Sequence, residues 1–405
     1  MNRISLRIAV VAMVLLPVTG RATAAWTETV LFRFSGEAPS GNLVSDKAGN
    51  LYGTTNHSVF KLTPPRAGQT SWAEALVYSF PGPPGNGPPY SLVMDAADNL
   101  YGVTAYEDAT PGTVFKLTPP AAGRTTWTKA VIHTFGNSEH YGPAGGLTID
   151  AAGNLYGVAI ADFEGDSHVF KLTRPPAGKT DWAETILANA APLSFASVSS
   201  VVFDKAGNLY GADAGNNACP GSGCGAVFKL TPPASGNGAW KKTVIYGFTG
   251  GTDGAQPLAG LAIGAAGVIY GATEAGGGKG SCSGYCGTVF KLIPPGAGRS
   301  RWTETVLYRF NPISRDGPTP TGGLTFDRAG NLLGVTEAAN NSNGRGTVYR
   351  LTRPSGGNGA WTNTILAQFY RMHPTSEPFS GPNGAVFGTA TPGNGSGGIV
   401  YKLTP

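Results

Sequence analysis

Residues 146–158 have the sequence GLTIDAAGNLYGV, and residues 168–173 have the sequence HVFKLT. In both stretches β-branched and aromatic residues alternate with small or polar ones, between clusters of Gly, Asn and Asp that favour turns. Together with the segment that starts at Trp182, this pattern predicts four short antiparallel strands, over 146–150, 154–158, 168–173 and 182–187. No segment after residue 25 shows the 3.6-residue apolar period of a helix.

The same unit recurs along the whole chain. Each copy has one Trp at the start of its fourth strand, at positions 26, 72, 127, 182, 240, 302 and 361. The tetrapeptide N-L-Y-G recurs at 50–53, 99–102, 154–157 and 208–211, and V-F-K-L recurs at 59–62, 114–117, 169–172, 227–230 and 289–292. A four-stranded antiparallel unit repeated seven times predicts an all-β fold, a seven-bladed β-propeller.

The phase of the repeat predicts a closed ring. The chain enters with a lone fourth strand, Trp26 to Phe34, and its last copy lacks a fourth strand. We expect this first strand to pair beside Val400 to Leu403, because the pairing removes two exposed sheet edges. Residues 25–405 are therefore predicted to form a single propeller domain. The seventh copy is the least regular, since Pro374, Pro378 and Pro382 interrupt its first strand.

The run G-L-x-x-D-x-x-G-N-L-Y-G-x-T, followed by G-T-V-F-K-L, resembles the GloVer tandem repeat of bacterial exported proteins, also described as choice-of-anchor proteins. The likeness extends over nearly all of residues 25–405. It implies export and surface association, and it implies no activity that maps onto particular residues. Members of that kind usually end in a sorting tail, whereas nothing follows Pro405 here, so we expect no C-terminal anchor.

The N-terminus predicts export independently. Arg3 and Arg7 precede a short apolar run from Ile8 to Leu16, and Ala22-Thr23-Ala24 fits a cleavage site, so residues 1–24 are predicted to be a signal peptide. No other stretch is long enough to span a bilayer. We expect a secreted or extracytoplasmic protein, in the periplasm or at the cell surface, and a monomer. The net charge of +5 falls to +2 without Arg3, Arg7 and Arg21, which gives no reason to expect nucleic acid as a partner.

The two ends of the predicted blades differ in their loops. Nine residues always separate the Leu of the third strand from the next Trp, whereas the insert from the Gly of the second strand to the Val of the third varies from 5 to 17 residues. We call the side with the varying loops the variable face and the other side the constant face. Binding residues are found preferentially on loops carried by a rigid scaffold, so the variable face is the candidate binding surface. Tolerance of solvent-exposed loops to insertions explains the same pattern without a function.

The predicted function is a non-catalytic binding or scaffold protein that uses the variable face for a glycan or an extracellular protein. Aromatic side chains among polar loop residues suit sugar binding. The candidate ligand-binding residues are Asn56, His57, Tyr106, Glu107, His168, Glu274, Tyr285 and Glu337. The alternative is a metal-assisted lyase or hydrolase with its site at the mouth of the central channel. No G-x-S-x-G, H-E-x-x-H or phosphate-binding loop is present, and we expect no cofactor, resident metal or catalytic residue.

The remaining motifs favour structural roles. Cys219, Cys224, Cys282 and Cys286 lie in the two longest inserts, and export favours disulfides over a zinc site, with 219–224 and 282–286 the shortest-range pairing. The Asp of D-x-x-G-N is interpreted as a turn former rather than a metal ligand. The periodic Trp and Tyr residues are interpreted as packing between blades rather than as sugar platforms.

Overall fold

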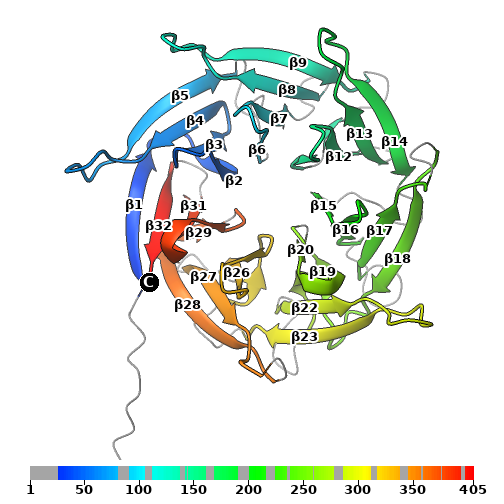
Figure 1. Ribbon diagram of the computed structural model, residues 1–405. Coiled ribbons are helices and arrows are strands. Elements are labelled where there is room, and N and C mark those ends of the chain that lie inside the picture. The colour runs from blue at the N-terminus through cyan, green and yellow to red at the C-terminus, as the bar shows by residue number, and fades with distance from the viewer. Residues whose placement is uncertain are drawn as a thin grey trace, which may run out of the picture.

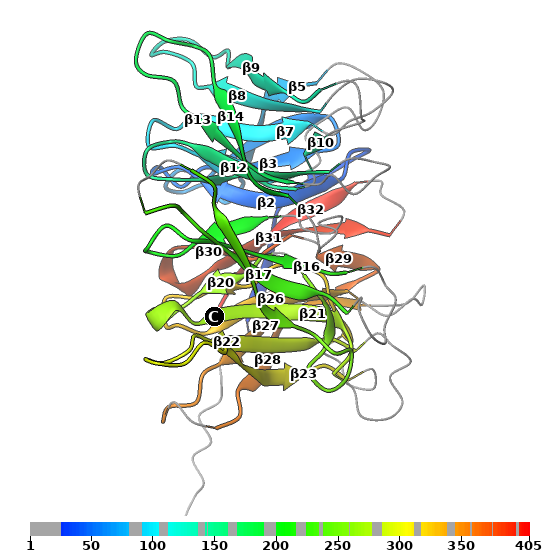
Figure 2. The same cartoon turned by 90° about the vertical axis from the view of Figure 1, so that its right-hand side faces the viewer.

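The computed structural model describes residues 26–80, 91–104, 112–136, 142–143, 145–160, 168–189, 200–215, 224–234, 238–258, 260–277, 286–311, 317–337, 345–356, 359–374, 376–393 and 397–405. These residues form seven antiparallel sheets, or blades, in a ring around a central channel, which confirms the seven-bladed propeller (Figure 1). Figure 2 shows the ring from its side, with the strands of each blade running between the two faces. Residues 1–24, which the sequence predicts to be a signal peptide, lie outside the described part of the chain.

Each blade has an inner strand at the channel and a fourth strand at the rim, and in blades 2 to 7 the inner strand is much shorter than the fourth. The strands of blades 1 to 3 are, from the channel outward, β2 (Pro39–Ser45), β3 (Leu51–Thr55), β4 (Ser58–Thr63) and β5 (Ala73–Ser79); β6 (Val93–Met94), β7 (Leu100–Thr104), β8 (Thr113–Thr118) and β9 (Thr128–Thr134); and β10 (Gly142–Pro143) with β11 (Thr148–Ile149), β12 (Leu155–Ile160), β13 (His168–Thr173) and β14 (Ala183–Asn189).

Blades 4 to 7 repeat this order. Their strands are β15 (Val201–Phe203), β16 (Leu209–Asp213), β17 (Ala226–Thr231) and β18 (Lys241–Gly247); β19 (Ala255–Pro257) with β20 (Ala262–Ile263), β21 (Ile269–Ala275), β22 (Thr288–Ile293) and β23 (Thr303–Arg309); β24 (Thr319–Pro320) with β25 (Thr325–Phe326), β26 (Leu332–Glu337), β27 (Arg345–Thr352) and β28 (Thr362–Tyr370); and β29 (Met372–Pro374) with β30 (Phe379–Ser380), β31 (Val386–Pro392), β32 (Gly398–Thr404) and β1 (Thr27–Phe34).

The predicted ring closure is confirmed. Strand β1 pairs antiparallel with β32, from Thr27 opposite Thr404 to Phe34 opposite Gly398. Blade 7 therefore combines β29 to β32 from the C-terminal part of the sequence with β1 from the N-terminal part. Its apolar side packs on blade 1 in one core cluster, in which Leu31 and Val400 lie with Leu51 and Phe60.

The N-L-Y-G and V-F-K-L motifs belong together because the Gly of the second strand lies under the aromatic ring of the third. A Cβ added at Gly157 would lie 2.6 Å from Cζ of Phe170. The same Gly–Phe contact occurs in the first, second, fourth and fifth blades. The aromatic ring therefore occupies the volume that any side chain at this Gly would need.

The structural interpretation of the D-x-x-G-N turn is confirmed. Oδ1 of Asp46 accepts hydrogen bonds from the backbone N–H groups of Ala48 and Asn50, both at 2.9 Å. Its Oδ2 accepts from Nδ2 of Asn50 at 2.6 Å and from the hydroxyl of Tyr52 at 3.0 Å. The Asp thus joins the constant-face turn to the aromatic residue of the second strand.

Where Gly replaces this Asp, the turn becomes a short 3₁₀ segment, at Ala265–Gly267 and at Pro382–Gly384. In the described residues no helix has the length and apolarity needed to cross a membrane.

The periodic aromatic residues pack between neighbouring blades, as predicted. Trp127 of blade 2 meets Tyr52 of blade 1 with ring centroids 5.8 Å apart, and Trp182 of blade 3 meets Tyr101 of blade 2 at 6.0 Å. Tyr52 and Tyr101 are buried. The Tyr rings are therefore part of the core, and the partly buried Trp rings pack against it.

Candidate functional site

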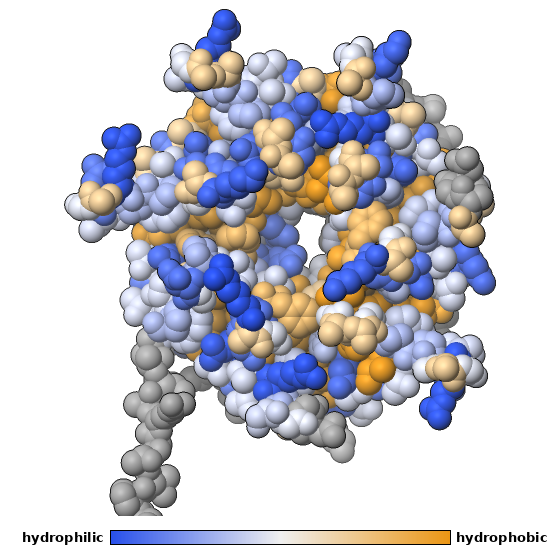
Figure 3. All heavy atoms as spheres, viewed as in Figure 1, coloured by the Kyte–Doolittle hydropathy of each residue, from blue (hydrophilic) through white to orange (hydrophobic). Residues whose placement is uncertain are grey.

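The channel holds a cavity of about 750 Å³. The central opening of the ring is visible in the space-filling view (Figure 3). The cavity reaches the variable-face ends of the second strands, where Asn56, Ala214, Glu274 and Thr391 line it. This volume lies within the range of about 300–1,000 Å³ that is usual for small-molecule sites.

One equivalent position in each blade contributes to the cavity wall, namely the residue before the inward Leu, Val or Pro of the first strand. In blades 1 to 7 these residues are Asn42, Ser91, Gly146, Ser200, Gly260, Gly323 and Glu377. The inner strand is irregular at this position. In blade 1 the register shifts between Ser40 and Val44, and in blades 3, 5, 6 and 7 the strand is split in two. Such bulges and breaks re-aim side chains out of the regular pleat.

The first strand of blade 3 therefore differs from its prediction. A continuous strand over residues 146–150 was expected, whereas β11 covers only Thr148–Ile149, and Gly146 lies in the break that faces the channel.

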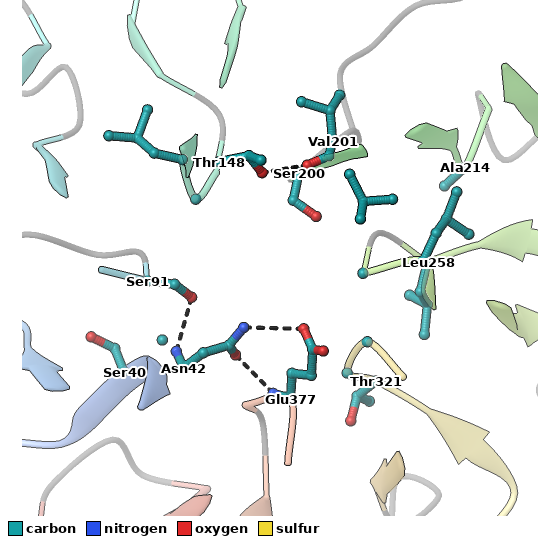
Figure 4. A pocket seen from close by; sticks show the side chains of 18 of the residues that line it. Ser40, Asn42, Ser91, Thr148, Ser200, Val201, Ala214, Leu258, Thr321 and Glu377 are labelled. Carbon is teal, nitrogen blue, oxygen red and sulfur yellow. Dashed lines mark hydrogen bonds between the residues drawn. The ribbon is translucent and has the colours of Figure 1, made fainter. Parts of the chain in front are cut away.

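Asn42, Ser91 and Glu377 form one connected polar group on the channel wall (Figure 4). Nδ2 of Asn42 donates to Oε2 of Glu377 at 3.3 Å, and the backbone N–H of Glu377 donates to Oδ1 of Asn42 at 2.8 Å. The backbone N–H of Asn42 donates to Oγ of Ser91 at 2.9 Å. Three neighbouring blades, 7, 1 and 2, are joined in this way.

Glu377 is an acid held in an unfavourable environment for its charge. The ring surrounds its side chain, and this burial raises the pKa of Glu377 to about 7, while the hydrogen bond from Asn42 acts in the opposite direction. The glycines of blades 5 and 6, Gly260 and Gly323, have no side chain to occupy the space that the carboxyl group of Glu377 fills. A Cβ at Gly323 would lie 3.0 Å from Oε2 of Glu377 and 2.7 Å from Cα of Gly260.

A second acidic group lies at the variable-face mouth. Glu274 near the end of β21 lines the cavity, and both its burial and the charge of Glu337 raise its pKa. Oε1 of Glu337 lies 3.5 Å from Nδ1 of His373. In the described residues no group of three or more His, Cys, Asp or Glu side chains is arranged to hold a metal ion.

The structure brings two of the candidate binding residues, Asn56 and Glu274, into the cavity wall. Glu337 lies close enough to Glu274 to raise its pKa, without lining the cavity itself. His57 is half-buried beside Asn56, and its carbonyl oxygen accepts a hydrogen bond from the backbone N–H of Phe80. Tyr106, Glu107 and Tyr285 lie outside the described residues.

His168 is placed away from the channel. It is buried at the start of β13, where its Nε2 lies 3.4 Å from Oε1 of Glu184. Nε2 of His133 in blade 2 lies 3.3 Å from the other carboxylate oxygen of Glu184. The two His residues hold the pKa of Glu184 at about 2, against the effect of its burial. This group joins blades 2 and 3 rather than the ligand cavity.

Both cysteines in the described part of the chain, Cys224 and Cys286, are disulfide-bonded. Cys219 and Cys282 lie outside it, so the pairing of the four remains a prediction.

A model of the Gloeobacter/Verrucomicrobia repeat matches residues 56–278 and 161–401, two overlapping ranges that together cover most of the chain. The chain belongs to the Gloeobacter/Verrucomicrobia repeat family. This match confirms the resemblance to the GloVer repeat that the sequence motifs indicated. No curated protein matches this chain.

Among solved structures, streptogramin B lyase matches with a TM-score of 0.56 at 14% identity, over 94% of this chain and 97% of the lyase. The extracellular domain of a putative one-component system from B. thetaiotaomicron matches with a TM-score of 0.50 at 12% identity, over 92% of this chain and 41% of that one. At these identities the likeness shows that the Gloeobacter/Verrucomicrobia repeat protein shares their fold, and it assigns no activity.

Proposed function

We propose that this protein is an exported, non-catalytic binding protein that takes the end of a glycan into its channel from the variable face. The observation that carries the proposal is the polar cavity wall formed by Asn42, Ser91, Ser200 and Glu377. Amide, hydroxyl and carboxyl groups that point into one small cavity provide the donors and acceptors that sugar hydroxyls need.

The location of the polar group supports binding over a purely structural role. Blades 3, 5 and 6 have Gly at the equivalent position and close the ring without a side chain there. A side chain at this position is therefore not needed to form a blade. Partial removal of a carboxylate from water costs stability unless it is compensated, and Glu377 is half-buried, which favours a functional reason for this residue.

The test is glycan binding by the chain without residues 1–24, screened on a glycan array and then measured by calorimetry. Asn42→Ala combined with Ser200→Ala is expected to weaken binding at least tenfold, because both remove hydrogen-bonding groups from the cavity. The matched control is Arg124→Ala with Lys179→Ala, two exposed constant-face residues. A glycan whose binding survives the first pair and is lost with the second contradicts the channel site.

A second candidate function is a lyase or hydrolase at the same cavity, and the pKa of Glu377 favours it. A carboxyl group that exchanges its proton near neutral pH is suited to general acid–base catalysis. The test is mass spectrometry of the bound glycan after prolonged incubation, with and without added divalent metal ions. Cleavage that Glu377→Gln abolishes establishes the enzyme, and an intact glycan supports the binding protein.

A further inference from the structure

The ionisable side chains that line the cavity are all acidic. Among the described lining residues the titratable side chains are Glu377 and Glu274, and no Lys, Arg or His lines the cavity with them. The wall otherwise consists of small apolar residues, hydroxyl side chains, two amides and glycines. A narrow space lined by one sign of charge concentrates ligands of the opposite sign.

The carboxyl group of Glu377 is incompletely paired within the described residues. Oε2 accepts one hydrogen bond, from Nδ2 of Asn42 at 3.3 Å, and the shorter contact between the two residues uses the backbone N–H of Glu377 instead. An ionised carboxylate accepts about four hydrogen bonds when fully satisfied. The remaining capacity faces the cavity (Figure 4), so a ligand group that donates several hydrogen bonds fits here.

The neighbours of Glu377 show where in the cavity the ligand's donor group would lie. Asn42 and Ser91 lie on one side of the carboxyl group, and Gly260 and Gly323 lie on the other. The glycines present no side chain to the carboxylate, so on that side Oε2 is bordered by backbone atoms. Ser200 projects into the cavity from the wall of blade 4 (Figure 4). A compact cationic group beside the carboxylate therefore has hydroxyl and amide partners within the same cavity.

We propose that the ligand carries a primary ammonium group next to hydroxyl groups, as a non-acetylated amino sugar does. The ammonium group binds the carboxylate of Glu377, and the neighbouring hydroxyls bind Asn42, Ser91 and Ser200. An ammonium group offers three donors and a full positive charge, which matches the unused capacity of Glu377. This inference rests on the proposed glycan-binding function and specifies the class of sugar.

The experiment compares three β-1,4-linked disaccharides, of glucosamine, N-acetylglucosamine and glucose, by calorimetry with the chain without residues 1–24 at pH 7.5. The glucosamine disaccharide is expected to bind at least tenfold more tightly than the other two. Glu377→Gln is expected to remove this preference while the glucose disaccharide still binds. Glu74→Gln is the matched control, because it removes the same charge at an exposed position on β5, away from the cavity.

Because Gln at this position leaves one new donor in the cavity, Glu377→Ser is the second variant. Ser is the residue of blades 2 and 4 at the equivalent position, and this variant is also expected to lose the preference. Its folding is checked by thermal unfolding beside the wild type.

The outcomes separate the two proposals. Equal binding of all three disaccharides leaves the glycan-binding function standing and overturns the amino-sugar inference, and so does a preference that survives in Glu377→Ser. Failure of every disaccharide and of the glycan array overturns the glycan-binding function itself. Displacement of the glucosamine disaccharide by an equimolar amount of Ca²⁺ or Mg²⁺ also overturns the inference, because it identifies the carboxylate as a metal-ion ligand.

Discussion

Asn42 and Glu377 lie 335 positions apart in the sequence, yet each donates a hydrogen bond to the other across the junction between blade 1 and blade 7. Asn42→Ala removes both bonds and leaves the backbone N–H of Glu377 without this acceptor. We expect a loss of about 1–3 kcal/mol in the free energy of unfolding. Urea denaturation measures this loss, and stability equal to that of the wild type contradicts the pairing.

Stability should depend on pH through Glu377. Burial holds its pKa at about 7 in the folded protein, above the 4.5 of an ordinary Glu. Between these two values the folded protein keeps a proton that the unfolded chain has released, so stability falls as the pH rises from 4.5 to 7. Glu377→Gln has no such proton. Relative to this variant, the wild type should lose about 1–3 kcal/mol over that range and then stay level. If the unfolding free energies of the wild type and of Glu377→Gln change in parallel with pH, the raised pKa of Glu377 is contradicted.

Closure by the first strand should be required for folding. Deletion of residues 25–35 removes β1 and leaves one edge of β32 unpaired. It also removes Leu31 and so exposes the apolar residues against which Leu31 packs. The melting temperature should fall by at least roughly 10 °C, or folding should fail. Circular dichroism measures this change. Deletion of residues 1–24 alone is the control, and it should leave the melting temperature unchanged.

The Gly–Phe contact within each blade predicts a steric effect. Gly157→Ala places a methyl group against the ring of Phe170 and should cost about 1–3 kcal/mol of stability. Gly136 is a matched control, because a Cβ there meets no atom within 4 Å. Gly136→Ala should change stability by no more than about 0.5 kcal/mol. Equal effects of the two substitutions in chemical denaturation contradict the packing argument.

The cysteines should form two local disulfides. Mass spectrometry of a non-reduced digest of exported protein is expected to join Cys219 to Cys224 and Cys282 to Cys286. Because each bridge closes a very short loop, its removal should cost only about 1–3 kcal/mol. Peptides that join Cys224 to Cys286 contradict this pairing, and thiols that become free only after chelation point to zinc.

The periodic motifs predicted most of the fold because each makes its contacts within one blade or with the neighbouring blade. Trp at the fourth strand, Gly under Phe and Asp in the turn all contact residues close in sequence or in the next copy, so repetition marks them. Closure was also predictable, because the unpaired first strand and the incomplete last copy complement each other.

The site was harder to predict because its main residue breaks the repeat. Glu377 lies between Pro374 and Pro378 in the least regular copy. The prolines there interrupt the alternation of apolar and polar residues that marks a strand. The residue before the inward apolar position of each first strand is the signal that would have found it. Its environment depends on the bulge in β2 and on the approach of Gly260 to Gly323, and no local pattern reports either.

The polar group at the junction of blades 7 and 1 also has a consequence for the order in which the protein is made. Asn42 and Ser91 leave the ribosome well before Glu377, which lies far downstream of both. A partly translated or partly exported chain therefore lacks the carboxylate and cannot present the complete cavity wall. Occupation of the channel would then distinguish chains that include Glu377 from products truncated before it, and it would hold blades 1 and 7 together once they meet.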